Sequence, residues 1–146
     1  MKNAIRIRRT LPALFAAILI PLCFASCAKK ASDADTLWSS AVYTADTALG
    51  DGETSIFVEV KAGEKSITFT IDTNAATLGE ALLENDIVSG EMGAYGLYIK
   101  SVNGMVADYD TDHTYWALYE NGELCMTSAD LTPVADGGHY ELVREG

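Results

Sequence analysis

The strongest constraint on the fold is a change of hydrophobic period between residues 56 and 85. Apolar residues recur at every second position in the runs 56–60 and 67–71, on either side of a turn at 62–65. Successive side chains of a strand point to opposite faces, so each run places an apolar row on one face. The two runs therefore predict a β-hairpin.

A short helix is predicted directly after this hairpin, over about residues 77–85. Thr77 and Glu80 have the spacing of a capping box, in which the hydroxyl accepts from the amide three residues on and the carboxylate reaches back. Leu78, Ala81 and Leu82 fall on one helical face. We expect this face to pack across the sheet.

Strands resume after a glycine-rich stretch, 90–96, which we interpret as a loop. Asn103-Gly104 and Asn121-Gly122 are strong signals for two-residue hairpin turns, because both residue types tolerate positive φ. A turn at 136–138 leads into a last strand, 139–144. The order of elements predicts an α+β domain, specifically a β-grasp-like mixed sheet with one short helix.

The N-terminus has the pattern of an export signal. Four basic residues among the first nine precede an uncharged apolar stretch that is shorter than the ~20 residues of a membrane span. Phe24-Ala25-Ser26-Cys27 resembles the lipobox of bacterial lipoproteins. We therefore expect cleavage before Cys27 and attachment of lipid, including acyl chains such as palmitate, to its thiol. The protein is then extracytoplasmic and lipid-anchored to the bacterial cell membrane.

This interpretation divides the chain into three segments: a lipoprotein signal peptide at 1–26, a tether at 27–52 and one domain at 53–146. Trp38 and Tyr43 are expected to dock on the domain although they lie in the tether. Cys125 is then the one cysteine without an assigned role in the mature chain, so we expect no intramolecular disulfide and no structural zinc site.

Charge excludes one class of partner. Without residues 1–26 the chain has six Lys and Arg against 21 Asp and Glu, a net charge of −15. Nucleic-acid phosphates require basic side chains, so no nucleic-acid partner is expected. Solubility explains such a surface most simply, and cationic partners remain compatible with it.

Four motifs in the domain occur in an order that is typical of one family. They are Thr77-Leu78-Gly79-Glu80-Ala81-Leu82, Ser101-Val102-Asn103-Gly104, Tyr115-Trp116-Ala117-Leu118-Tyr119-Glu120-Asn121-Gly122 and the Asp136-Gly137 turn. In this order they resemble the DUF4430 family, also described as the transcobalamin-like C-terminal domain. The resemblance covers most of the chain from Ser55 onward.

The resemblance implies a β-grasp-like domain and a ligand. In animal cobalamin carriers the similar domain closes over the corrin ligand, so capture of a corrinoid for uptake is the implied function. Two departures separate this chain from the carriers. Nothing in it could supply their large helical domain, and Gly138 stands where many relatives have an acidic residue.

An aromatic group on one expected strand supplies candidate ligand-binding residues. Tyr115 and Tyr119 share one face and Trp116 lies on the other. In one interpretation Trp116 is core and both tyrosines are ordinary strand residues. In the other, a flat ligand stacks on an aromatic ring and is oriented by Asn121 or a backbone amide.

Met92 and Tyr95, in the glycine-rich stretch, are further candidates. Glycines permit close approach of a ligand, so this loop is either a plain connector or a mobile lip over a cleft.

Metal and catalytic signals are weak. Asp108, Asp110 and Asp112 have the spacing that begins a calcium loop, but His113 stands where Gly is needed and Tyr119 where the bidentate Glu is needed. We therefore interpret the segment as a solvated loop without metal. No phosphate loop, GxSxG or HExxH motif is present, so we expect no enzyme and no cofactor.

Two functions are compatible with these observations. The first is a surface-anchored lipoprotein that binds a small flat ligand, of corrinoid type, and passes it to a transporter. The alternative is a protein–protein interaction or adhesion module at the cell surface, because the edge of a β-grasp sheet can accept a strand from a partner.

Overall fold

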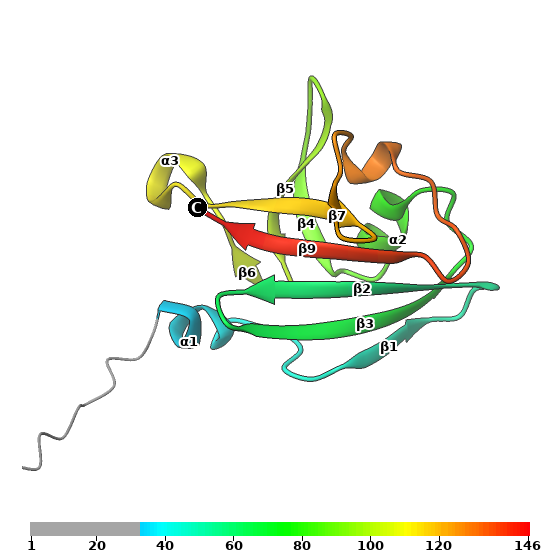
Figure 1. Ribbon diagram of the computed structural model, residues 1–146, viewed down its shortest axis with the longest axis horizontal. Coiled ribbons are helices and arrows are strands. Elements are labelled where there is room, and N and C mark those ends of the chain that lie inside the picture. Colours follow the sequence, from blue (N-terminus) through cyan, green and yellow to red (C-terminus); the bar gives the residue numbers. More distant parts are fainter. Residues whose placement is uncertain (1–32) are drawn as a thin grey trace, which may run out of the picture.

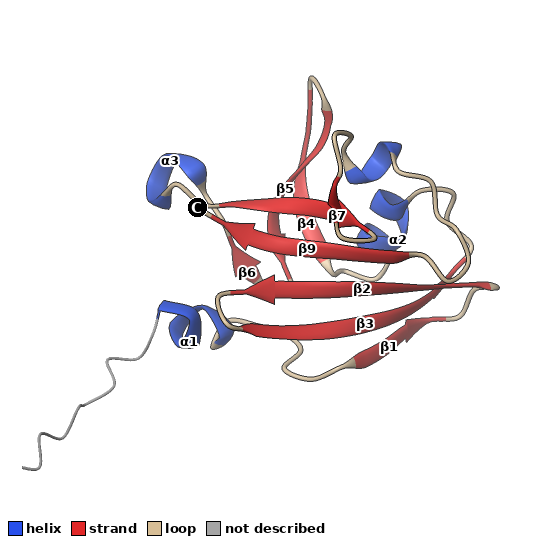
Figure 2. Ribbon diagram, in the orientation of Figure 1, coloured by secondary structure: helices blue, strands red, loops and turns tan. Residues whose placement is uncertain are grey.

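Two β-sheets and a few short helices make up residues 33–146, the part of the chain described by the computed structural model (Figure 1; Figure 2). The elements are α1 (Asp33–Trp38), β1 (Thr47–Gly50), β2 (Thr54–Ala62), β3 (Lys65–Thr73), α2 (Leu78–Glu84), β4 (Val88–Gly93), β5 (Gly96–Val102), β6 (Met105–Val106), α3 (Tyr109–Asp112), β7 (Tyr115–Glu120), β8 (Glu123–Leu124), the 3₁₀ helix η1 (Ala129–Leu131) and β9 (His139–Glu145).

The larger sheet is mixed and has the strand order β1-β3-β2-β9-β7-β8. The hairpin of β2 and β3 is antiparallel. At the centre of the sheet, β2 and the C-terminal strand β9 run parallel. An N-terminal hairpin with a parallel C-terminal strand beside it confirms the α+β architecture expected from the order of elements. The sequence suggested one mixed sheet, but a separate three-stranded sheet, β4-β5-β6, also forms.

The glycine-rich stretch is a strand and not the expected loop. β4 pairs antiparallel with β5, and Gly93 lies opposite Gly96 at the tip of this hairpin. Gly90 allows this close pairing because it has no side chain. A Cβ at this position would lie 2.1 Å from the carbonyl oxygen of Tyr98 on β5. Figure 1 shows the hairpin tip standing away from the rest of the fold.

Helix α2 begins as its sequence predicted. The Thr77 hydroxyl accepts a hydrogen bond from the backbone N–H of Glu80, and Leu78, Ala81 and Leu82 are buried. The carboxylate of Glu80 accepts from the N–H of Ala76, one residue before the position expected for a capping box.

Both Asn-Gly turns form with positive φ at each residue, 52° and 79° at Asn103-Gly104 and 51° and 82° at Asn121-Gly122. They connect β5 to β6 and β7 to β8 as expected. The strand after the second turn is shorter than predicted, because β8 ends at Leu124.

Residues 33–52, which the sequence placed in the tether, include α1 and β1. β1 pairs parallel with β3 at the edge of the larger sheet. Trp38 is buried, and Tyr43 packs edge-on against Phe69 with ring centroids 5.4 Å apart. Both residues therefore dock as expected. The signal peptide and Cys27 lie outside the described residues.

The core lies between the inner face of the larger sheet, the smaller sheet and α2. Alternation along β2, β3 and β9 supplies its largest part, and the helix adds one face. Its most deeply buried large side chains are Ile56, Val58, Val60, Phe69, Ile71, Leu78, Leu82, Ile87, Val102, Met105, Tyr140 and Leu142. Within residues 33–146 no helix has the length and apolar character needed to cross a membrane.

Candidate functional site

Three hollows in the surface meet at Tyr98, on β5. Tyr98 is 48% exposed, and it lines all three. Strand alternation explains this position, because Leu97 and Ile99 on either side of it are buried in the core. Tyr98 is therefore the residue that joins these hollows into one candidate site.

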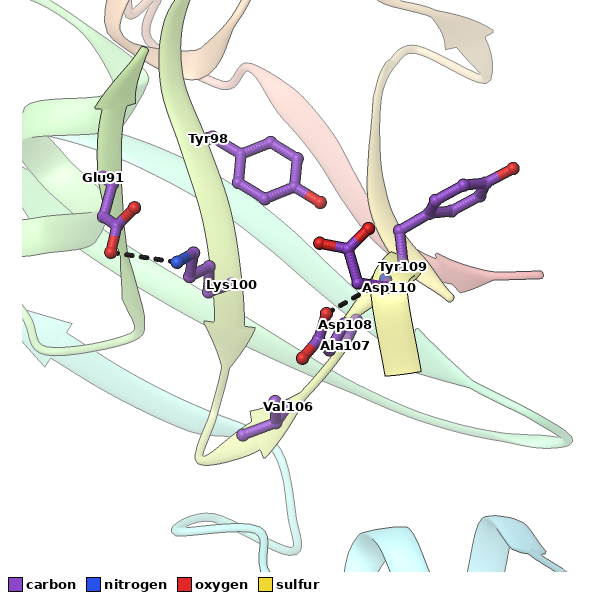
Figure 3. A pocket seen from close by; sticks show the side chains of 8 residues that line it. All are labelled: Glu91, Tyr98, Lys100, Val106, Ala107, Asp108, Tyr109 and Asp110. Atoms are coloured by element: carbon purple, nitrogen blue, oxygen red, sulfur yellow. Dashed lines mark hydrogen bonds and ion pairs between the residues drawn. The ribbon is translucent and has the colours of Figure 1, made fainter. Parts of the chain in front are cut away.

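The largest of these three hollows, of about 570 Å³, is here called the acidic hollow (Figure 3). One wall comes from β4 and β5, where the Lys100 ammonium lies 2.9 Å from the Glu91 carboxylate. Hydrogen bonding to this carboxylate raises the pKa of Lys100. The opposite wall is the segment 106–110, which leads from β6 into α3.

Asp108 shapes this second wall. Its carboxylate accepts hydrogen bonds from the backbone N–H of Asp110 and the hydroxyl of Thr111. Asp108 thereby caps α3, so the segment that was interpreted as a solvated loop contains a turn of helix. The capping leaves the side chains of Tyr109 and Asp110 at the rim of the acidic hollow.

The second hollow, of about 400 Å³, lies at the β4–β5 hairpin and is here called the hairpin hollow. Its walls are the hairpin tip, 93–98, and the segment 125–128. Asp130 joins these walls, because its carboxylate accepts from the backbone N–H of Leu97 and the hydroxyl of Ser128. These hydrogen bonds lower the pKa of Asp130.

The third hollow, of about 250 Å³, is the β5–β7 groove. Residues 97–99 form one side and residues 115–118 the other. β8 pairs only with Tyr119 and Glu120, so residues 115–118 of β7 pair with β9 on one side and have no strand on the other. Cys125 also lines the groove, and burial raises the pKa of its thiol.

Exposed apolar side chains concentrate around these hollows. Twelve large hydrophobic residues are exposed within residues 33–146, and seven of them line one of the three hollows. An exposed apolar cluster of this kind is typical of a binding surface. The seven are Tyr95, Tyr98, Val106, Tyr109, Tyr115, Leu124 and Met126.

Only some of the candidate residues on and after β7 line one of the three hollows. Trp116 is 8% exposed and lies on the core side, and its indole N–H has no hydrogen-bond partner within the described chain. Trp116 and Tyr115 nevertheless both line the β5–β7 groove. Tyr119 and Asn121 line none of the three hollows, and Asn121 forms the turn to β8.

Tyr115 and Tyr119 share a polar partner. Both hydroxyls donate to the carboxylate of Glu145 on the neighbouring strand β9, at 2.9 and 2.5 Å. These hydrogen bonds raise the pKa of each tyrosine, because ionisation would place two negative charges side by side.

The remaining two candidates lie on the β4–β5 hairpin. Tyr95 is 93% exposed and lines the hairpin hollow. Met92 is 70% exposed on the same hairpin but lines none of the three hollows. Tyr95 therefore adds apolar surface to the hairpin hollow, whereas Met92 pairs with Leu97 and lies outside the hollows that Tyr98 lines.

Sequence reasoning missed Tyr98, Lys100 and the acidic hollow. The alternation of β5 already placed Tyr98 and Lys100 on the face away from the core. What the pattern could not show is that the segment 106–110 folds back beside them.

The two histidines lie apart. His113 ends α3 in a left-handed conformation, and the ring of His139 stacks on Phe57. No group of three His, Cys, Asp or Glu side chains within residues 33–146 is arranged to hold a metal ion.

Comparison with known proteins identifies the family. Residues 75–139 match the model of DUF4430, a domain of unknown function. A "putative metal binding protein" from Ruminococcus gnavus ATCC 29149, whose crystal structure was determined at 1.30 Å, is 41% identical to the chain. The match has a TM-score of 0.61 and covers 64% of this chain and 97% of that one. The chain belongs to the DUF4430 family.

A second solved structure similar to this DUF4430 protein is haptocorrin in complex with Cbi. It is 24% identical, with a TM-score of 0.48, and the match covers 63% of this chain and 25% of haptocorrin. No curated protein matches the sequence.

Proposed function

We propose that this DUF4430 domain binds a small, flat, partly apolar molecule at Tyr98, without catalysis, and that corrinoids are the first ligands to test. The observation that carries the proposal is the convergence of three hollows on one half-exposed tyrosine. Ligand sites are typically concave, largely apolar and furnished with a few polar groups. The family resemblance directs the choice of corrinoids.

The surroundings of Tyr98 suit a flat ligand. The ring offers a face for stacking, and the exposed side chains of Tyr95 and Met126 extend the apolar surface along the hairpin hollow. The groups that could orient a ligand lie on the opposite side, in the acidic hollow. The hollows open to the surface, so the site is a platform on which a ligand remains partly exposed.

The direct test is isothermal titration of the full-length chain, in a non-ionic detergent, with cobinamide, cobalamin and haem. We expect heat with at least one corrinoid and a dissociation constant in the micromolar range or tighter. Tyr98→Ala should weaken binding about five- to 150-fold, since loss of an aromatic stacking contact costs about 1–3 kcal/mol.

Tyr119→Ala is the matched control, because Tyr119 lies outside the hollows. Equal losses in both variants would contradict a site at Tyr98. No heat with any of the three ligands would refute the choice of corrinoids.

We also propose that the protein is held on the outer face of a bacterial cell membrane by lipid on Cys27. The motivation is the lipobox-like sequence ending at that residue. Labelling growing cells with an alkyne analogue of palmitate should tag the wild-type chain and leave Cys27→Ala untagged. Equal labelling of both chains would overturn the proposal.

A second candidate is a protein-interaction module, favoured by the outer edge of β4. β4 is one of the two edge strands of the smaller sheet and is exposed from Ser89 to Gly93. Such an edge can accept an extended segment of a partner. Cross-linking in intact cells through a photoreactive residue at Ser89 should then recover a partner protein, and recovery of none would exclude this candidate.

A further inference from the structure

Residues 33–146 have a large net negative charge, because acidic side chains far outnumber Lys and Arg. Residues 33–146 contain four Lys and Arg against 21 Asp and Glu, a net charge of −17. Each of the four cations already forms an ion pair with a carboxylate. Every further carboxylate therefore lacks a cationic partner from Lys or Arg within this part of the chain.

The acidic hollow concentrates this charge beside aromatic rings. Glu91, Asp108 and Asp110 line it, and Lys100 is its one cation. The Lys100 ammonium is paired with Glu91, which leaves the carboxylates of Asp108 and Asp110. The hydrogen bond to Glu91 is the main cause of the raised pKa of Lys100, and the negative charge of Asp108 adds to it.

The two carboxylates differ in what they already bind. Asp108 accepts hydrogen bonds from Asp110 and Thr111. The carboxylate of Asp110 forms no hydrogen bond or ion pair with any other described residue. In Figure 3 it lies near the hydroxyl of Tyr98, whereas the ring of Tyr109 points away from Tyr98.

Both rings can meet a ligand. Tyr98 is 48% and Tyr109 is 56% exposed, and both line the hollow. The Tyr109 ring also packs against His113, whose ring centroid lies 5.5 Å from that of Tyr109. The face of an aromatic ring attracts a cation held within about 6 Å of its centroid, through the electrostatic quadrupole of the ring. Proteins recognise quaternary ammonium ligands with aromatic side chains in this way.

We propose that the acidic hollow binds the ammonium group of an organic cation, a quaternary or primary amine, through Tyr98, Tyr109 and Asp110. A bare metal ion fits poorly, because calcium needs six to eight oxygen ligands and Asp108 already uses its carboxylate to cap α3. A volume of about 570 Å³ lies within the range of small-molecule sites. This inference rests on the proposed function, because it names the chemistry of one part of the same site.

The test compares choline with dimethylbutanol, its uncharged isostere in which carbon replaces nitrogen. Each is titrated into the isotopically labelled full-length chain in non-ionic detergent and followed by two-dimensional NMR. Choline should shift the backbone signals of residues 98–100 and 106–110, and dimethylbutanol should bind at least about tenfold more weakly. Added salt should weaken choline binding, because the attraction is between charges.

Asp110→Asn should reduce choline affinity about tenfold, as should Tyr98→Leu, which removes a ring of the hollow. Glu123→Gln is the control: it removes the same charge from β8, outside the acidic hollow, and should change choline affinity less than twofold. Equal binding of choline and dimethylbutanol, or an unchanged affinity in Asp110→Asn, would overturn the inference. The two proposals can fail separately. If cobinamide gives no heat but the protein still binds choline more tightly than dimethylbutanol, the corrinoid proposal is refuted and this inference is supported.

Discussion

The indole N–H of Trp38 donates a hydrogen bond of 2.9 Å to the backbone carbonyl of Ala62, the last residue of β2. Trp38 is 7% exposed and belongs to the core cluster of the domain. Tyr43, five residues later, is also bound to the domain. Its backbone N–H donates to the side-chain oxygen of Asn103, and its carbonyl accepts from the side-chain nitrogen of Asn103. The segment after α1 is therefore part of the folded domain.

Trp38→Ala should destabilise the domain by about 3–5 kcal/mol, because it removes a buried aromatic side chain and leaves a cavity. Chemical denaturation followed by circular dichroism measures the change. Val42→Ala, at a side chain that is 68% exposed in the same segment, should change the free energy of unfolding by less than about 0.5 kcal/mol. A neutral Trp38→Ala would show that the segment is only a tether.

Asp130→Asn should destabilise the domain by about 1 kcal/mol at pH 7, because the carboxylate accepts two hydrogen bonds that hold the segment 125–131 against β5. The folded-state pKa of Asp130 is lowered. Its contribution is therefore present above the unfolded pKa of about 3.9 and lost as pH falls through the folded pKa. Urea unfolding at several pH values should show the difference between wild type and variant shrinking in acid. A constant difference would contradict this assignment.

Glu145→Gln should lower the pKa of Tyr115 and Tyr119 toward the ordinary value of about 10. Their folded-state pKa values are raised by the shared carboxylate, so the stabilisation is present below pH 10 and is lost as pH rises through the folded pKa. NMR of ring-labelled tyrosine in alkaline titrations measures both values. Unchanged titration of Tyr119 would exclude the hydrogen bond to Glu145, and Glu123→Gln provides the control.

Gly90→Ala should destabilise the β4–β5 hairpin by about 1–3 kcal/mol, because its Cβ would lie 2.1 Å from the backbone oxygen of Tyr98 and the strands would have to separate. Gly93→Ala is a matched control, since its Cβ would meet nothing nearer than 3.6 Å. Thermal unfolding and hydrogen exchange of Tyr98 report the effect. Equal effects of the two substitutions would argue that backbone crowding does not determine the pairing.

Local patterns predicted the elements that depend on local chemistry. The alternation in β2 and β3, the Thr77 cap and the two Asn-Gly turns specify a hairpin, a helix start and two reversals without help from the rest of the chain. The aromatic alternation likewise predicted that Trp116 and Tyr115 lie on opposite faces. Burial of Trp116 agrees with its interpretation as a core residue.

Elements that depend on distant pairing were missed. β1 is a four-residue strand whose only ladder partner is β3, and β4 contains two glycines that ordinarily disfavour strands. The acidic hollow lies where α3 returns to the face of β5, and this segment is held by contacts of Arg144 with Asp112 and with the backbone of Val106, and by a backbone hydrogen bond from Ala107 to Lys100. No sequence period encodes such contacts.

The most direct test of a binding site at Tyr98 is hydrogen–deuterium exchange of the full-length chain with and without cobinamide. We predict slower exchange in the hairpin 88–102 and in the segments 106–110 and 123–128, with no change along β1 and β3. Unchanged exchange throughout, or protection confined to β1 and β3, would contradict it.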